Sequence, residues 1–415
     1  MVRSADVDLV IIGAGAAGLA AARTATGNGL SHVAVEAMGR IGGRAQTDLD
    51  TFGFPWDRGC HWLHSASLNP MRRIADEAGF RYRTTGSRYR GRAGGDWLPD
   101  DAYDRLEESA ERCLAATLAA GHRGGDRPCS EVADHEEPGY GLFTTWMFAE
   151  WGQAPEDIST LDAARYRDSG EDWPVEDGYG ALVAHHARGL GISLDTPVTR
   201  IDWGGPGVRV TTSRGTIAAR AAVITVSTGV LAAGTIRFDP PLPDWKLEAA
   251  AAVPLGRANK VAFAVPGDTL GVSEPTAITV PVAGSTMIVR LLPFGRDHAD
   301  VYLAGPVCRD LEAAGEAEMI ETCRDALVSE LGADLRARLG AVASTRWGHE
   351  PTILGAYAAA KPGQAHLRAD LARPLGDRLF FAGEATHPEF YSTCHGAHLS
   401  GIDAVQTIAT VDGRR

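Results

Sequence analysis

The sequence predicts an α/β protein with two domains, one of them built on a parallel sheet, and three observations support this. A short apolar run, Leu9–Ile12, leads directly into the pattern Gly13-Ala14-Gly15-Ala16-Ala17-Gly18, and an alanine-rich helical stretch follows. A second apolar strand then ends at Glu36. Strand, glycine turn, helix and strand in this order form the nucleotide-binding unit of a Rossmann-like domain. The third observation is the length, because 415 residues are enough for a second domain.

The glycine pattern predicts a binding site for the phosphates of a dinucleotide. The first glycine permits a tight turn, the second lets the backbone approach a pyrophosphate, and the third lets the helix pack closely on the strand. The helix N-terminus offers N–H groups and the positive end of its dipole to the phosphates. The carboxylate that follows is placed to hold a ribose diol. The expected contacts are Gly13, Gly15, Ala16, Ala17, Gly18, Glu36 and Ala37.

The next segment narrows the choice of dinucleotide. Gly42, Gly43 and Arg44 follow soon after Glu36, where a nicotinamide-binding domain would continue into its next helix. Paired glycines let the backbone pass close to a cofactor, and an arginine donates a fork of hydrogen bonds to a pyrophosphate. This arrangement resembles the FAD-dependent amine oxidase family, and the resemblance recurs along almost the whole chain. It implies FAD as the cofactor, and a mixed-sheet α+β substrate-binding domain beside the Rossmann-like FAD-binding domain.

Composition and charge restrict the partners. The 40 Lys and Arg residues against 53 Asp and Glu residues give a net charge of −13, without any basic run. We therefore expect neither nucleic acid nor an anionic membrane as a partner, whereas cationic small molecules are mildly favoured. The six cysteines form no C-x-x-C pair, so neither a metal site nor a disulfide framework is expected.

The ends of the chain and its apolar runs bear on localisation. No stretch approaches 18 uninterrupted apolar residues, no charged and apolar leader opens the chain, and residues 412–415 are polar. We therefore expect a soluble, cytoplasmic protein without a membrane anchor, either as a monomer or as a homo-oligomer.

Hydrophobic periodicity and turn residues predict the elements between these motifs. Helices are expected over 101–120, 140–151, 181–189 and 310–331, and strands over 192–194, 197–203, 208–212, 215–218, 222–226, 261–265 and 379–382. In the two-domain arrangement that the resemblance implies, residues 1–67, 181–245 and 366–415 form the FAD-binding domain. Residues 68–180 and 246–365 form the substrate-binding domain.

The resemblance to the amine oxidases assigns further residues to FAD. Segment 59–62 is similar to the family segment that runs past the flavin ring, and the backbone after Pro197 is similar to its adenine contact. The turn at 383–384 supplies a carboxylate, and the helix after it directs its N-terminal dipole at the flavin N1–C2=O group. The residues assigned in this way are Gly42, Gly43, Arg44, Gly59, Cys60, His61, Trp62, Val198, Gly383, Glu384, Thr393, Cys394 and Ala397.

The catalytic candidates are Lys260 and His64. Lys260 matches the family lysine that reaches flavin N5 through a bridging water, and His64 matches a substrate-facing His or Glu of polyamine-oxidising members. Without the resemblance, a lysine at a strand edge is usually solvated and a histidine is more often a satisfied core residue.

The chain departs from the family pattern in front of the flavin. Ala359 and Thr393 stand where many amine oxidases place two aromatic rings around the substrate amine. Both residues are expected in the substrate pocket with His64, and their small size argues against a simple aromatic monoamine. Ala358 stands where monoamine oxidases attach the flavin to a cysteine, so FAD should be bound non-covalently.

An acidic cluster precedes the helix expected over 181–189. Its members are Glu171, Asp172, Glu176 and Asp177. At a cavity mouth such a cluster would attract an ammonium group, but a solvated loop is the favoured interpretation.

The reaction implied by the resemblance is hydride removal from the carbon beside an uncharged amine nitrogen to flavin N5. The imine product hydrolyses, and O2 reoxidises the flavin and forms H2O2. The expected substrate is a small-molecule primary or secondary amine or a polyamine. Three alternatives remain open. They are an L-amino-acid oxidase, for which no arginine clamp is obvious over 59–65, a pathway-specific oxidase or desaturase of a nitrogenous metabolite, and a flavin-binding protein without turnover.

Overall fold

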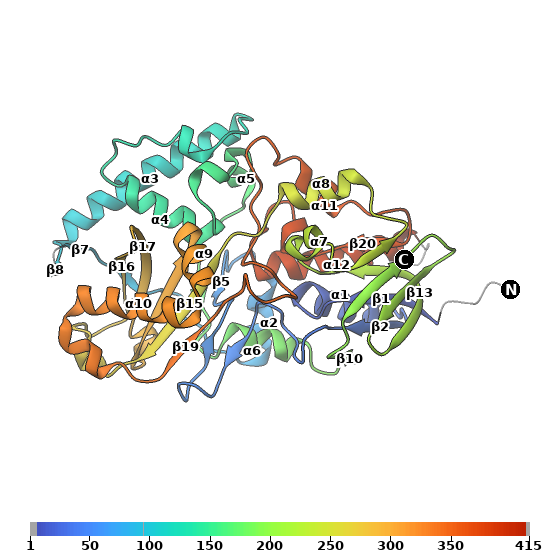
Figure 1. Cartoon of the computed structure of the whole chain (residues 1–415), viewed down its shortest axis with the longest axis horizontal. Coiled ribbons are helices and arrows are strands. Elements are labelled where there is room, and N and C mark those ends of the chain that lie inside the picture. The colour runs from blue at the N-terminus through green and yellow to red at the C-terminus, as the bar shows by residue number, and fades with distance from the viewer. Residues whose placement is uncertain (1–5, 94, 412–415) are drawn as a thin grey trace.

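The computed structural model describes residues 6–93 and 95–411, so the polar end at 412–415 lies outside the described residues. The chain forms two halves, each organised around its own sheet (Figure 1). No helix among the described residues is long and apolar enough to cross a membrane.

The half that contains β1 and α12 is built on an eight-stranded sheet with the order β10-β2-β1-β13-β12-β11-β14, and β20 also pairs with β13. β1 runs parallel to β2 and β13, and β20 runs parallel to β13, so the carboxyl ends of these strands meet at one edge. The strands are β1 (Val7–Ile12), β2 (His32–Val35), β10 (Ile192–Ser193), β11 (Val198–Asp202), β12 (Val208–Thr212), β13 (Gly215–Ile224), β14 (Arg237–Asp239) and β20 (Leu379–Phe381).

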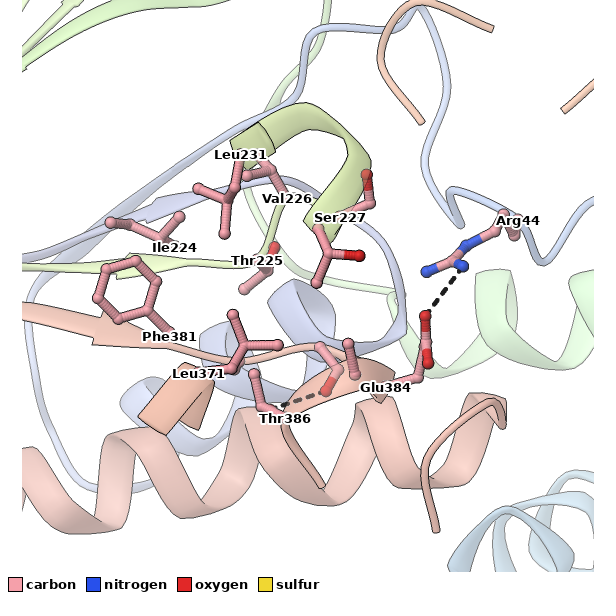
Figure 2. A pocket seen from close by; sticks show the side chains of 14 residues that line it. Arg44, Ile224, Thr225, Val226, Ser227, Leu231, Leu371, Phe381, Glu384 and Thr386 are labelled. Carbon is pink, nitrogen blue, oxygen red and sulfur yellow. Dashed lines mark hydrogen bonds and ion pairs between the residues drawn. The ribbon is translucent and has the colours of Figure 1, made fainter. Parts of the chain in front are cut away.

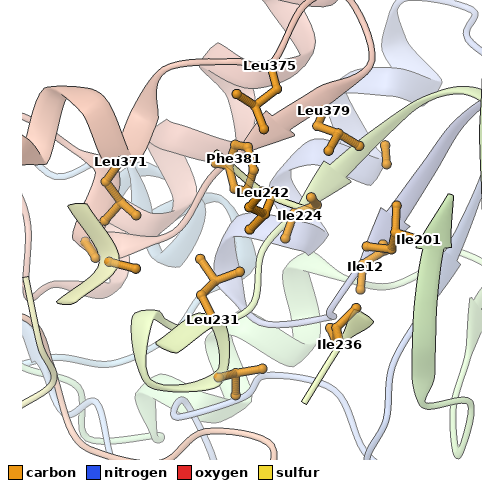
Figure 3. Packing of buried hydrophobic residues seen from close by; sticks show 14 of the residues in the cluster. Ile12, Ile201, Ile224, Leu231, Ile236, Leu242, Leu371, Leu375, Leu379 and Phe381 are labelled. Atoms are coloured by element: carbon orange, nitrogen blue, oxygen red, sulfur yellow. The ribbon is translucent and has the colours of Figure 1, made fainter. Parts of the chain in front are cut away.

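Two sets of helices pack on this sheet. On one face α1 (Ala16–Gly27) packs against α12 (Cys394–Val411), and their alanines and valines form one apolar cluster with the sheet. A second apolar cluster joins the same sheet to three further helices, α7 (Thr228–Ala233), α8 (Asp244–Ala252) and α11 (Leu367–Ala372). Figure 3 shows this layer, in which Ile224 and Phe381 of the strands lie near Leu231 and Leu371 of the helices.

The other half is built on a six-stranded mixed sheet with the order β19-β15-β18-β17-β16-β6. Its pairs are antiparallel except for β16 with β6. The strands are β6 (Arg88–Tyr89), β15 (Ala258–Ala264), β16 (Thr276–Val282), β17 (Ser285–Leu291), β18 (His298–Ala304) and β19 (Val342–Ser344). The helices beside it are α3 (Asp100–His122), α4 (Tyr140–Trp151), α5 (Thr160–Arg165), α9 (Gly305–Ala314) and α10 (Glu316–Leu331).

The remaining strands and α-helices are short. They are β3 (Thr47–Asp48), β4 (Trp56–Asp57), β5 (Trp62–Leu63), α2 (Pro70–Ala78), β7 (Arg92–Ala93), β8 (Asp96–Trp97), β9 (Trp173–Pro174) and α6 (Tyr179–His186). The exact division into domains stays a prediction. Helix α8, which spans the expected boundary at 245–246, packs with α7 and α11 on the eight-stranded sheet.

Two expected elements differ from the structure. The single helix expected over 310–331 is two helices, because Gly315 between them has a φ of +115°, outside the helical region. The two strands expected over 215–218 and 222–226 are one, β13. Its first half pairs antiparallel with β12 and its second half parallel with β1, so pairing continues through the alanine-rich middle.

Candidate active site

The expected dinucleotide site lies where β1 enters α1. A Cβ atom added to Gly15 would meet no atom within 4 Å, whereas one on Gly18 would lie 1.9 Å from the backbone oxygen of Gly13. The second glycine therefore borders open space, and the third permits close packing. The N–H groups of the first helical turn, Ala16 to Gly18, make no hydrogen bond to any residue that the structure describes. They remain available to an anion.

Glu36 lies at the end of β2, and its carboxylate is 7% exposed. It accepts hydrogen bonds from the backbone N–H groups of Ala14 (2.6 Å) and Met38 (2.9 Å). These bonds hold the carboxylate beside the glycine turn. Open space at Gly15, free N–H groups and a fixed carboxylate together fit the adenosine and pyrophosphate part of FAD.

Arg44 and Glu384 join the glycine segment to the last strand of the sheet. Arg44 Nη1 donates to Glu384 Oε1 at 3.1 Å and to the backbone oxygen of Ala356. The second oxygen, Glu384 Oε2, accepts from the N–H groups of Ala358 (3.3 Å) and Ser392 (3.0 Å). Glu384 therefore holds three backbone segments in place, in addition to any contact with FAD.

Figure 2 shows the cavity beside this ion pair, with Arg44 and Glu384 at one end. Its wall also contains Thr225, Val226 and Ser227, which the sequence analysis did not select. Thr225 Oγ1 donates to the backbone oxygen of Ile12 at 2.8 Å, beside the first glycine. The sequence could have indicated these residues, because they follow β13, which runs parallel to β1, and the glycine turn follows β1.

Lys260 lies in a buried polar group between the two sheets. Its side chain is 4% exposed, and Nζ donates to the backbone oxygen of Asp57 at 2.7 Å. Burial lowers the pKa of Lys260, although the carboxylate of Asp300 opposes the shift. Burial also lowers the pKa of the neighbouring His61 to about 4, so that ring is neutral near pH 7. Arg290 forms an ion pair with Asp300 at 3.3 Å in the same group.

His64 and three carboxylates form a second group. His64 Nδ1 lies 2.9 Å from Asp172 Oδ1. Burial disfavours the charged ring, but the bond to Asp172 and the negative charges of Asp172 and Glu150 together raise the pKa of His64. Glu150, near the end of α4, is exposed to solvent. Neighbouring protein still desolvates its carboxyl group and raises the pKa of this group to about 7; His64 opposes the rise, whereas Asp168 and Asp172 add to it. We call His64, Glu150, Asp168 and Asp172 the acidic group.

The sequence analysis treated four acidic residues as one cluster, and the structure separates them. Glu176 and Asp177 form ion pairs with Arg81, at 3.3 Å and 2.6 Å. Only Asp172 lies with His64. Glu150 was missed because it stands in an aromatic helix, where the sequence pattern indicated core packing.

Two residues expected in the substrate pocket have structural contacts. Thr393 caps α12, because its hydroxyl accepts from the N–H group of Gly396 (3.0 Å) and donates to the backbone oxygen of Phe390 (2.6 Å). Ala359 has no exposed surface and packs in an apolar cluster with Tyr391. The position of Ala359 in the substrate pocket stays a prediction, and the structure shows that its short side chain is covered by its neighbours.

Comparison with known proteins identifies the family. The family model described as flavin containing amine oxidoreductase matches residues 16–115 and 140–409. The chain belongs to this family. Polyamine oxidase 2 of Arabidopsis thaliana is 30% identical over 96% of this chain and 87% of that protein. Lysine-specific histone demethylase 2 of Homo sapiens is 26% identical over 97% of this chain, but over 53% of that protein.

Solved structures support the same fold. Cyclohexylamine oxidase from Brevibacterium oxydans has a TM-score of 0.79 and 24% identity, over 98% of this chain and all of that chain (100%). Putrescine oxidase bound to putrescine has a TM-score of 0.79 and 21% identity, over 97% of this chain and 99% of that chain. The predicted α/β amine oxidase architecture is thus confirmed. Family membership also confirms FAD as the cofactor and makes the chain an oxidoreductase that acts on CH–NH or CH–NH2 groups.

Proposed function

We propose that this amine oxidase acts on diamines or polyamines, that is, on amines with a second ammonium group. The observation that carries the proposal is the acidic group, in which Asp172 and Glu150 interact with His64 and Asp168 interacts with Glu150. The charges of neighbouring carboxylates add, so the group attracts a cation more strongly than a single carboxylate does. The net charge of −13 also favours a cationic substrate.

The cofactor contacts proposed here follow the sequence analysis. The glycine turn, Glu36 and Arg44 would hold the nucleotide and pyrophosphate, and the start of α12 would face the flavin. FAD would be bound non-covalently, because the methyl side chain of Ala358 cannot form a thioether. When bound, FAD supplies hydride acceptance from the carbon beside the amine nitrogen and electron transfer to O2, which forms H2O2.

The chain's own residues would position the substrate and balance its charge. The acidic group would hold the distal ammonium, so that the reacting amine lies toward Lys260 and the proposed flavin site. His64 would keep a proton to a higher pH than an ordinary histidine, and above its pKa it could accept one from the reacting amine. Positioning of this kind reduces the entropy that the reaction must lose.

An L-amino-acid oxidase would need a free cation for the substrate carboxylate. Arg290 lies near the proposed flavin site, over the ring of Trp62, but its charge is already matched by Asp300. This pairing favours amines over amino acids.

The proposal is tested by mixing the yellow holoenzyme anaerobically with single compounds and following loss of the oxidised-flavin absorbance at about 450 nm. The compounds are linear diamines, polyamines, acetylated polyamines, monoamines and L-amino acids. We expect diamines or polyamines to reduce the flavin fastest, with H2O2 formed when air is admitted. Faster reduction by monoamines would contradict the substrate class. Reduction by L-amino acids alone would replace the proposal with the amino-acid alternative.

A further inference from the structure

Two cysteines from distant parts of the sequence meet beside the proposed flavin site. Cys60 follows Gly59 on the segment that leads into β5, and its N–H group donates to the backbone oxygen of Arg44 at 3.3 Å. Cys394 is the first residue of α12. Both side chains pack against one apolar cluster, which contains Leu63 and Tyr179. The two thiols are close enough to interact with each other.

These two cysteines differ from the other four in the chain. Both are partly exposed, whereas Cys113, Cys129, Cys308 and Cys323 are buried. Burial raises the pKa of each of those four thiols, so they stay protonated and unreactive. The interaction with Cys394 lowers the pKa of the Cys60 thiol; burial opposes this shift, and the positive charges of Arg44 and Lys260 support it. Because these two cations favour its thiolate, we assign Cys60 as the nucleophile of the pair and Cys394 as its partner.

We propose that Cys60 and Cys394 are a peroxide-reactive dithiol, which H2O2 converts to a reversible disulfide. The oxidant is the H2O2 that reoxidation of the enzyme by O2 releases in the same region, and in this respect the inference rests on the proposed function. Oxidation would join the segment after Gly59 covalently to the start of α12, the two elements that flank the proposed flavin site.

The reaction balances in two steps. The Cys60 thiolate attacks one oxygen of H2O2, so an S–O bond forms, the O–O bond breaks and hydroxide leaves, which takes up a proton to form water. Cys60 is then a sulfenic acid. The sulfur of Cys394 attacks the sulfur of Cys60, an S–S bond forms, the S–O bond breaks, and the released hydroxide takes the thiol proton of Cys394. Two thiols and one H2O2 give one disulfide and two waters.

The test treats the holoenzyme with dilute H2O2 in the absence of amine, then quenches with catalase. Free thiols are titrated after denaturation, and the intact mass and the cross-linked peptide are measured by mass spectrometry. We expect the thiol count to fall from six to four, with the mass of two hydrogen atoms lost and a peptide joining Cys60 to Cys394. Dithiothreitol should restore all six thiols. A second arm replaces H2O2 with substrate and air, with and without catalase.

The variants Cys60→Ala and Cys394→Ala should lose the disulfide, and Cys394→Ala should instead leave Cys60 as a sulfenic or sulfinic acid. The control Cys113→Ala removes a buried cysteine and should form the disulfide as the wild type does. The inference is overturned if thiol loss is the same in Cys60→Ala, or if the wild type accumulates sulfinic acid without a disulfide. A disulfide with added H2O2, but no flavin reduction by any amine, would refute the proposed function while supporting the dithiol.

Discussion

The ionisation of Glu150 should make the preference of the enzyme for diamines depend on pH. Its carboxyl pKa is raised to about 7, chiefly by desolvation, so its negative charge is present above pH 7 and is lost below it. The ionised fraction rises from about one tenth at pH 6 to about nine tenths at pH 8, a change of about tenfold, or about 1.4 kcal/mol. If Glu150 holds the distal ammonium of the substrate, the preference for a diamine should rise by the same factor.

The assay compares kcat/KM for a linear diamine with kcat/KM for the monoamine of equal length, from pH 6 to pH 8. Titration of Lys260 and of the reacting amine affects both substrates and cancels in the ratio. We expect the ratio to rise about tenfold in the wild type. It should be lower and independent of pH in Glu150→Gln. Glu156→Gln removes an exposed carboxylate soon after the same helix and should behave as the wild type.

Two results would refute this reasoning. A wild-type ratio that does not change with pH would show that Glu150 does not discriminate the two substrates. A slope that persists in Glu150→Gln would assign the effect to His64, whose raised pKa also places its titration in this range.

Three further predictions concern folding and cofactor binding. Gly18→Ala should purify with little FAD, because the new methyl group would lie 1.9 Å from a backbone oxygen of the glycine turn; Gly27→Ala, with no atom within 4 Å, should keep a normal flavin-to-protein ratio. Asp162→Ala should lower the free energy of unfolding in denaturant by about 3–5 kcal/mol, since it leaves the buried Arg368 without its 2.6 Å partner; a loss below about 1 kcal/mol would contradict this. Burial lowers the pKa of His298 to about 4, so its contribution to stability is complete above about pH 6.5 and falls, by up to about 3 kcal/mol, as the pH drops toward 4. His298→Phe should flatten this part of a stability-against-pH curve, and an unchanged curve would show that other groups cause it.

The cofactor motif was predictable because its information is local. A strand, a glycine turn, a helix and Glu36 follow one another within a short stretch, and each residue type has a conformational or electrostatic reason to stand where it does. In the structure, Gly15 borders open space and hydrogen bonds fix Glu36 beside the glycine turn. The missed break at Gly315 is also local, but a glycine in a helical pattern leaves the backbone angle undecided.

The acidic group and the cysteine pair were not predictable from spacing. His64 and Asp172 come from different short elements, and Glu150 comes from a helix whose aromatic residues predicted core packing. Likewise, Cys60 and Cys394 come from opposite parts of the chain. No periodic pattern records contacts of this kind, because they arise only when whole elements pack against one another.

By itself, the sequence determined the fold class, the FAD motif and the family resemblance, since these depend on local conformational preferences and on motif order. Only the tertiary structure decided which carboxylates lie near His64, which thiols meet, and that Ala359 is covered. The physical reason is that pKa shifts, hydrogen bonds between distant segments and burial depend on neighbours in space, which folding brings together from many parts of the chain.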